Sequence, residues 1–326
     1  MKIKRIPLIF CVVIAASVAA AIYVRADKVQ YQGSSLGSLR SPNHVGQTTE
    51  VRVAAANSVS TRGPSSIRYK TAFAESNNYW AYAHEILPAA KAGDPDAQFY
   101  LSRLLEKCDQ DNKMFFQHKG QKLTLDEGLQ FAVQRHLSMA SAQSVFEKCH
   151  EFQENDPAEL GSAAAWLAKA TDAGQPLAQA TTASKILMQE LMQRFSQASG
   201  APNPNASDVI ESNTDPRELL RLAVESKDPE VFFSIGDVQT LLDPTNTDAS
   251  TNRLAWWLVA CERGLDCSAN ADWVKNTCAS DPQCASVDSP RDFVRTLAQD
   301  SWPDVEQRAR EISAKLDAGK WDELGI

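Results

Sequence analysis

The chain has 326 residues, of which 33 are basic and 41 are acidic, giving a formal net charge of −8 at pH 7. A chain of this length can bury a sizeable core in one large domain or two ordinary ones. The acidic balance argues against nucleic acids and anionic lipid head groups as partners, because both attract basic surfaces.

The first 26 residues have the pattern of an export segment. Lys2, Lys4 and Arg5 precede the uncharged stretch 6–24, and basic residues ahead of an apolar run keep the N-terminus in the cytoplasm while the following chain is translocated. Two interpretations stay open, because the run is close to the roughly 20 residues that span a bilayer. An uncleaved anchor would hold the protein on the periplasmic side of the inner membrane. A cleaved signal peptide would leave it soluble, in the periplasm or secreted.

Residues 27–66 are rich in Ser, Gly, Gln and Asn and show no sustained helical period. This composition predicts a flexible linker. A linker of about 40 residues would let a folded head move tens of ångströms from the membrane, on the square-root scaling of flexible chains.

Residues 67–326 carry repeated start signals for helices. An acceptor side chain followed by proline places a cap before a first helical residue whose missing N–H costs nothing. These pairs are Asp94-Pro95, Asp156-Pro157, Asp215-Pro216, Asp228-Pro229 and Ser289-Pro290. Three starts add the carboxylate that completes a capping box. They are Asp156 with Glu159, Asp215 with Glu218, and Thr124 with Glu127.

Glycines mark the ends of these helices, because a left-handed C-cap favours a residue without Cβ. The glycines in question are Gly93, Gly174, Gly200, Gly264 and Gly319. Between the signals, apolar residues recur three and four apart, and alternation with period two is never sustained. The sequence therefore predicts an all-α domain, with one long helix from about Thr124 to Cys149.

Two segments align as copies of one helical pattern. Residues 165–174 (AWLAKATDAG) and 255–264 (AWWLVACERG) share Ala, Trp and Gly at equivalent positions, and residues 87–98 and 222–231 are degenerate copies. Small alanines let two antiparallel helices approach closely, while Trp or Phe fills the gap to the next hairpin. Because a single hairpin cannot bury its apolar face, neighbouring hairpins must stack.

The stretches WLAKATDAGQPLAQA and AAKAGDPDAQFYLSRLL resemble the Sel1-like subset of tetratricopeptide-type repeats. In that family a helix ending in Ala-x-x-Gly meets a second helix bearing an Ala and a Leu or Tyr. The resemblance implies adaptor-like binding of a protein or peptide on a concave face, and it carries over no catalytic residue. Spacing departs from the family: Gly93 to Gly174 is 81 residues, Gly174 to Lys227 is 53, and Lys227 to Gly264 is 37. We therefore expect an irregular stack of antiparallel helical hairpins.

Six of the seven cysteines follow the export segment, and an even set in an oxidising compartment predicts disulfides. Cys108 and Cys149 end two similar stretches, LLEKC and VFEKC. This likeness predicts a bridge between them.

The other four cysteines form a disulfide-rich part at about residues 255–290, with the spacing Cys261-x5-Cys267-x10-Cys278-x5-Cys284. Structural zinc usually takes pairs two to four residues apart, so the spacing does not favour a metal. Local bridges Cys261–Cys267 and Cys278–Cys284 are the favoured pairing. The interleaved pairing of Cys261 with Cys278 and Cys267 with Cys284 stays open, because spacing does not fix connectivity.

Sequence motifs predict no catalytic residue, cofactor or metal site. The five histidines lie in different segments, none paired with another on an i, i+4 helix face, and the common hydrolase, metalloprotease and nucleotide-binding motifs do not occur. An enzyme acting on cell-envelope polymer through a carboxylate pair in a helical cleft remains the alternative.

Aromatic residues are concentrated near the first hairpin. Tyr79, Trp80 and Tyr82 are the first candidate for an exposed binding patch, although aromatics at helical spacing more often pack in a core. The sequence as a whole favours an envelope-located binding or adaptor module for a protein or peptide partner, in contact with the membrane only through its N-terminal segment.

Overall fold

The computed structural model describes residues 64–118, 120–135, 139–199, 214–242, 248–268, 271, 273–274 and 289–326. The predicted export segment, most of the predicted linker and the predicted Cys278–Cys284 bridge lie outside these residues. Among the described helices, none is long and apolar enough to cross a bilayer.

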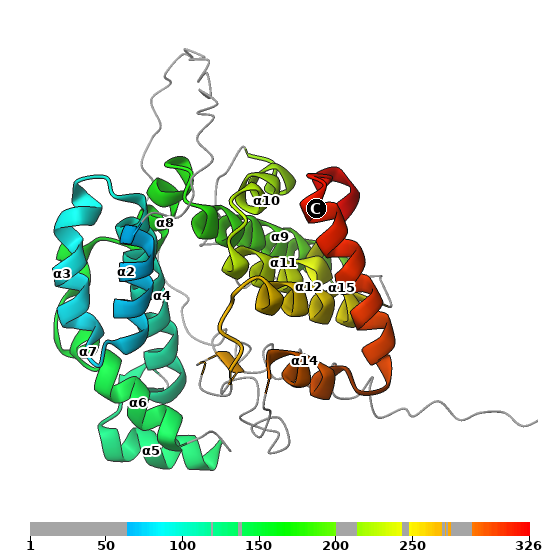
Figure 1. Ribbon diagram of the computed structural model, residues 1–326. Helices are drawn as coiled ribbons and strands as arrows, with labels where there is room; N and C mark the ends of the chain where they lie inside the picture. Colours follow the sequence, from blue (N-terminus) through cyan, green and yellow to red (C-terminus); the bar gives the residue numbers. More distant parts are fainter. Residues whose placement is uncertain are drawn as a thin grey trace, which may run out of the picture. The chain divides into compact units, whose positions relative to one another are not determined.

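The chain is mostly helical, which confirms the all-α prediction (Figure 1). The strands among the described residues form a two-residue antiparallel pair, β1 (Gln117–His118) with β2 (Gln121–Lys122). In chain order the helices are α2 (Pro64–Glu75), α3 (Tyr79–Lys91), α4 (Pro95–Phe115), α5 (Leu125–Gln134), α6 (Met139–Cys149), α7 (Glu151–Glu154), η1 (Pro157–Leu160), α8 (Ala163–Asp172), α9 (Pro176–Ser199), α10 (Pro216–Glu225), α11 (Pro229–Leu242), α12 (Ala249–Glu262), α14 (Pro290–Ala298), η3 (Gln299–Ser301), α15 (Trp302–Asp317) and η4 (Trp321–Leu324).

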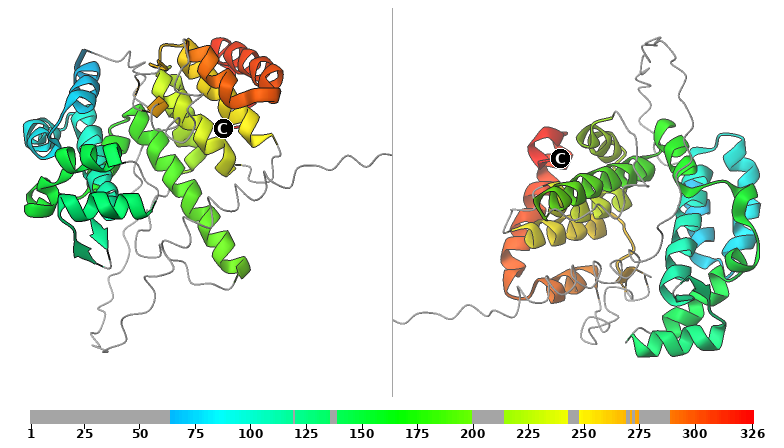
Figure 2. Two further views of the ribbon diagram at one scale, coloured as in Figure 1. Left: turned by 90° about the horizontal axis from the view of Figure 1, so that it is seen from below. Right: turned by 180° about the vertical axis from the view of Figure 1, so that it is seen from behind.

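The helices pack in a recurring order. Short turns join three pairs of consecutive helices: α3 with α4, α8 with α9, and α10 with α11. The second helix of each pair packs against a helix that comes later in the chain. Thus α4 packs on α8, α9 on α10, and α11 on α12, as Figures 1 and 2 show. Close approach needs small side chains. A Cβ on Gly236 of α11 would lie only 2.9 Å from the Trp257 side chain of α12.

The predicted helix starts are largely confirmed. Asp94, Asp215, Asp228 and Ser289 each accept a hydrogen bond from a backbone N–H within the first turn that follows. Thr124 and Glu127 form the reciprocal capping box. In the other two predicted boxes the carboxylate pairs elsewhere: Glu159 with His84, and Glu218 with Arg221.

The long helix predicted from about Thr124 to Cys149 is wrong, because the structure divides this stretch into α5 and α6. The two helices fold against each other around a second apolar cluster built on Phe115 and Phe116. Leu129 of α5 and Phe146 of α6 both reach this cluster. A continuous helix of that length would carry these two side chains too far apart to share one partner.

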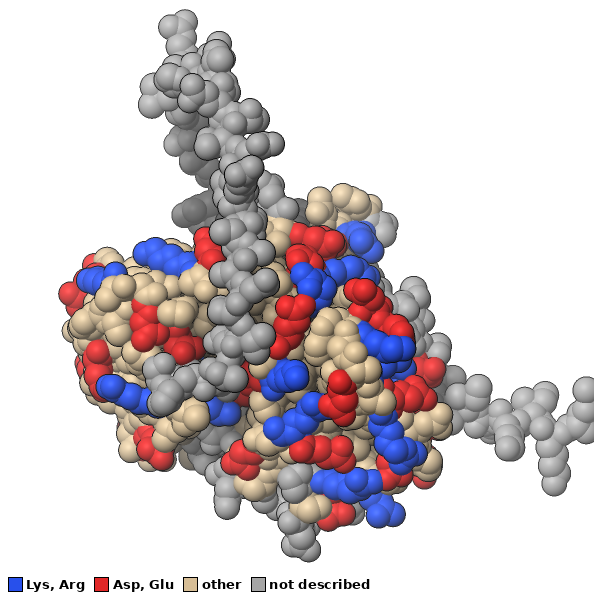
Figure 3. All heavy atoms as spheres, turned by 45° about the horizontal axis from the view of Figure 1, so that its top comes forward, with Lys and Arg blue, Asp and Glu red and all other residues tan. Residues whose placement is uncertain are grey.

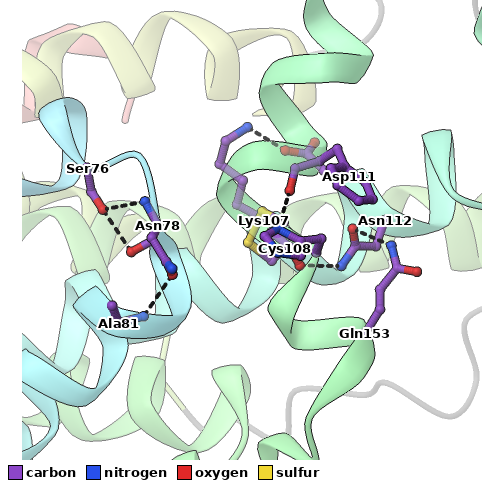
Figure 4. Close-up of a disulfide and its surroundings, with 11 residues drawn as sticks. Ser76, Asn78, Ala81, Lys107, Cys108, Asp111, Asn112 and Gln153 are labelled. Carbon is purple, nitrogen blue, oxygen red and sulfur yellow. Dashed lines mark hydrogen bonds and ion pairs between the residues drawn. A yellow bond between two sulfur atoms is a disulfide. The ribbon is translucent and has the colours of Figure 1, made fainter. Parts of the chain in front are cut away.

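Two disulfides join described residues, in the pairings that the sequence favoured. Cys108 of α4 is bonded to Cys149 at the end of α6, and Cys261 of α12 to Cys267. The second bond excludes the interleaved pairing. Around the first bond, the Asn112 side chain donates to the Cys149 carbonyl at 3.2 Å, and Gln153 donates to Asn112 at 2.9 Å (Figure 4). This bond therefore joins the end of α6 to α4 within the main hydrophobic core.

Candidate helix-binding surface on α3 and α4

The structure divides the three residues of the predicted aromatic patch between core and surface. Tyr79 and Tyr82 are only 2% and 5% exposed, whereas Trp80 is half-buried. The prediction of an exposed patch is therefore wrong for both tyrosines. They lie three apart on α3 and face inward, while Trp80, next to Tyr79, lies at the edge of this face.

Helix α2 contacts both tyrosines. Its buried or half-buried residues Tyr69, Ala72 and Phe73 have the i, i+3, i+4 spacing of one helix face. The Phe73 ring stacks on Tyr79 with 5.1 Å between centroids, and it lies 5.8 Å from Tyr100 of α4. An amphipathic helix laid on an aromatic surface in this way is a known mode of peptide recognition.

Polar groups fix the register of α2. The Tyr69 hydroxyl donates to Asp94 Oδ2 at 3.0 Å, and the Tyr82 hydroxyl donates to the Tyr69 carbonyl at 3.0 Å. Burial, together with the bond to Asp94, raises the pKa of Tyr69. Tyr69 is therefore a neutral donor at physiological pH, and Asp94 serves both as its acceptor and as the N-cap of α4.

Two cations complete the contact. Lys70 Nζ lies 2.7 Å from Glu230 Oε1 at the start of α11, so α2 connects α4 with a helix far along the chain. The Arg103 guanidinium of α4 lies 5.2 Å from the centre of the Phe73 ring, within the range of a cation–π contact. We call the surface under α2, made of Tyr79, Tyr82, Asp94, Tyr100, Arg103 and Glu230, the α2 seat.

Trp80 belongs to a separate cluster at the edge of α3. Its ring makes an edge contact with Phe152 at 5.0 Å and lies 4.8 Å from His84. His84 Nε2 is 2.6 Å from Glu159 of η1, and this hydrogen bond raises the pKa of His84. These contacts hold the α7–η1 segment against α3.

Two surface pockets contain few side chains that could act as an acid or a base. The larger, about 560 Å³, is lined by Leu129, Val133, Met139 and neighbours, with Asp126 as its single carboxylate. In the smaller, about 200 Å³, Glu190 faces Arg194 and Asp215 caps α10. Within the described part of the chain, no group of three or more His, Cys, Asp and Glu side chains is arranged to hold a metal ion.

Charge does not mark out a binding site on the face that Figure 3 shows. On this face, blue and red side chains are interspersed among tan ones instead of separating by sign. Recognition by bulk electrostatic attraction, as for a polyanion, would need one sign to dominate. The α2 seat, with its aromatic centre and individual carboxylates, is the more specific feature.

Sequence reasoning did not identify α2 as a separate helix, although a signal for it was present. The predicted linker ended at residue 66, so residues 64–66 of α2 fell in the linker and the other nine in the predicted helical domain. The segment PSSIRYKTAFAE opens with proline and places Tyr69, Ala72 and Phe73 on one helix face. The segment is short and only weakly amphipathic, so its sequence alone does not identify it as a helix. Its packing on α4 does.

Comparison with protein-family models, with curated proteins and with solved structures finds no match to this chain.

Proposed function

We propose that this chain is an exported helical-repeat binding module of the cell envelope, which recruits a protein or peptide partner through the α2 seat. In this proposal residues 6–24 deliver the chain across the membrane and either anchor it there or are removed. The remainder acts by binding and carries out no chemistry of its own.

The helix packing supports the Sel1-like part of the proposal. Two residues after α3, α8 and α12 comes a glycine with positive φ, at Gly93, Gly174 and Gly264, and two residues after α10 comes Lys227 with φ 58°. After α3, α8 and α10 the next helix begins two residues beyond this position, at Pro95, Pro176 and Pro229, and such a tight turn is the unit that a stack of hairpins repeats.

The disulfides support the proposed compartment. Such bonds persist in the periplasm or outside the cell and are rare in a reducing cytoplasm. The two that join described residues fit an exported protein, and both lie in parts of the chain that would be translocated.

The observation that carries the binding proposal is the seating of α2. A 12-residue helix packs two aromatic rings on α3 and α4 and joins Asp94 and Glu230 by polar contacts. The repeat surface thus already binds one amphipathic helix, that of its own chain, in the helix-in-groove mode.

A photo-crosslinking residue tests the proposal in the envelope. We expect the full chain with the crosslinker at Arg103, a residue of the seat, to form adducts with another protein. The same crosslinker at Arg194, an exposed residue of α9, is the control and should form few adducts. Equal yields at both positions, or adducts at Arg103 within the chain alone, would contradict a partner site at the seat.

A further inference from the structure

The helix α2 lies outside the recurring order of paired helices. It precedes α3 across three residues, 76–78, and it packs chiefly on α4. Isolated helices shorter than about 12–15 residues are marginal in water, and α2 has 12. Its helical state therefore depends on the seat.

Few groups hold α2 in place. Tyr69, Ala72 and Phe73 supply the apolar contact, and the polar contact consists of two hydrogen bonds at Tyr69, a partly exposed ion pair from Lys70 to Glu230 and an exposed one from Arg68 to Glu85. Ile67, on the opposite face, and Arg68, at the side of the packed face, are exposed, and Arg68 lies 3.8 Å from Glu85 of α3. Segments with so few buried contacts open at lower free energy than the whole domain unfolds.

Removing α2 would expose a surface with a distinct chemistry. The rings of Tyr79 and Tyr100 would form its apolar centre, and the carboxylates of Asp94 and Glu230 would lose their contacts to Tyr69 and Lys70. A ligand that restores these contacts needs two aromatic side chains four apart and a cation next to the first.

We propose that α2 is an exchangeable occupant of its seat, and that the partner inserts an amphipathic helix with the α2 pattern, aromatic-Lys-x-x-aromatic. This inference rests on the proposed binding function and adds the chemistry of the partner and a self-inhibitory contact. The partner must compete with α2, so its apparent affinity is its intrinsic affinity reduced by the fraction of molecules in which α2 has left.

The probe is a labelled synthetic peptide with the sequence of residues 64–75, titrated into the purified full chain in detergent and followed by fluorescence anisotropy. Lys70→Glu in the chain replaces the ion pair to Glu230 with a like-charge contact and leaves the apolar packing intact. We expect this variant to bind the peptide about fivefold more tightly than the unaltered chain, because its own α2 leaves more often. Phe73→Ala should have a larger effect, about tenfold or more.

Arg68→Glu is the matched control on the same helix. Its side chain is 73% exposed and lies 3.8 Å from Glu85, whose side chain is 63% exposed. Solvent screens such a pair, so binding should stay within about twofold of the unaltered chain. A control peptide with serine in place of both aromatic residues should bind more than tenfold more weakly. Melting curves of each variant check that the rest of the fold is intact.

Three results would overturn the inference: equal peptide affinity for the unaltered chain, Lys70→Glu and Phe73→Ala; equal affinity for the serine peptide; or no peptide binding at all. Dimerisation of the unaltered chain, seen by light scattering and suppressed by Lys70→Glu, would also overturn it by identifying a second copy of α2 as the occupant. Crosslinks from position 103 are an independent measurement. A partner captured there while the peptide fails would retain the binding module and remove the helix-exchange inference.

Discussion

Lys227 takes the backbone position that Gly174 takes in the preceding pair of helices. The Gly174 N–H donates to the Thr171 carbonyl at 2.9 Å, and the Lys227 N–H donates to the Val224 carbonyl at 3.0 Å, so each lies three residues beyond its acceptor. Both have positive φ, 78° at Gly174 and 58° at Lys227. The left-handed conformation carries no steric penalty for glycine, but in lysine it brings Cβ close to the following carbonyl.

We expect Lys227→Gly to stabilise the fold by about 1 kcal/mol. Removing the left-handed penalty contributes about 1–2 kcal/mol, and the greater freedom of glycine in the unfolded chain offsets part of it. Urea unfolding of the two proteins measures the difference. Lys227→Ala keeps the strained backbone and should leave stability nearly unchanged, while a stability gain from Lys227→Ala equal to that from glycine would implicate the side chain instead.

The two tryptophans of the aligned repeat copies should behave as core residues. Trp166 and Trp256 are 6% and 1% exposed, and the Trp166 indole N–H donates to the Leu160 carbonyl at 2.5 Å. Trp166→Ala and Trp256→Ala should each destabilise the fold by about 3–5 kcal/mol. Thermal melts measure this loss of stability, with Met188→Ala at an exposed site as the control. Unchanged melting temperatures for both tryptophan variants would show that the repeat alignment is wrong.

Local signals in the sequence predicted much of the fold because they act over three or four residues. The cap residue Asp94 and the terminal glycine Gly174 need no tertiary information. The bridge between Cys108 and Cys149 also followed from the likeness of two short stretches, each at a helix end.

Features that depend on contacts between distant residues could not be predicted in this way. Tyr79 and Tyr82 contact α2, a helix that packs chiefly on α4, and neither the tyrosines nor the α2 segment identifies the other in the sequence. The division between α5 and α6 similarly depends on Phe116, which lies before both helices in the chain. In each case the apolar residues are present in the sequence, but the residues against which they pack lie elsewhere in the chain.

The two described disulfides should contribute unequally to stability. Their cysteines are separated by 41 residues in Cys108–Cys149 and by 6 in Cys261–Cys267. On the chain-entropy model, removing the first should cost about 4 kcal/mol and the second about 2 kcal/mol. Paired Cys→Ala variants in urea unfolding provide the test. Because all four cysteines are buried, the packing losses are comparable, and an equal or larger loss for the short loop would contradict this order.

A thiol count on the unfolded, unreduced chain tests the pairing of Cys278 with Cys284. If all six cysteines after the export segment are oxidised, Cys11 is the remaining thiol, and it is present only while the export segment is uncleaved. We therefore expect one free thiol per uncleaved chain and none per cleaved chain. Two or more would mean that at least one predicted bridge does not form.

The pair of His84 and Glu159 should make stability depend on pH. The hydrogen bond to Glu159 raises the pKa of His84 above its ordinary value of 6.5, with further contributions from the Trp80 carbonyl and from the charge of Glu151. In the unfolded chain these partners are absent, so the folded state binds the proton more tightly. The resulting stabilisation is fully present below about pH 6.5 and is lost as pH rises through the raised pKa.

Replacing His84 with glutamine should remove this dependence. We expect the difference in free energy of unfolding between the unaltered chain and His84→Gln to be largest near pH 6 and to shrink toward pH 9. Both side chains are partly exposed, 37% for His84 and 63% for Glu159, so solvent screening limits the effect to less than about 1 kcal/mol. Glu159→Gln should remove the same pH-dependent part, and the double variant should lose no more than either single one. High salt should weaken the effect, whereas a difference that grows with pH would assign the opposite sign to the interaction.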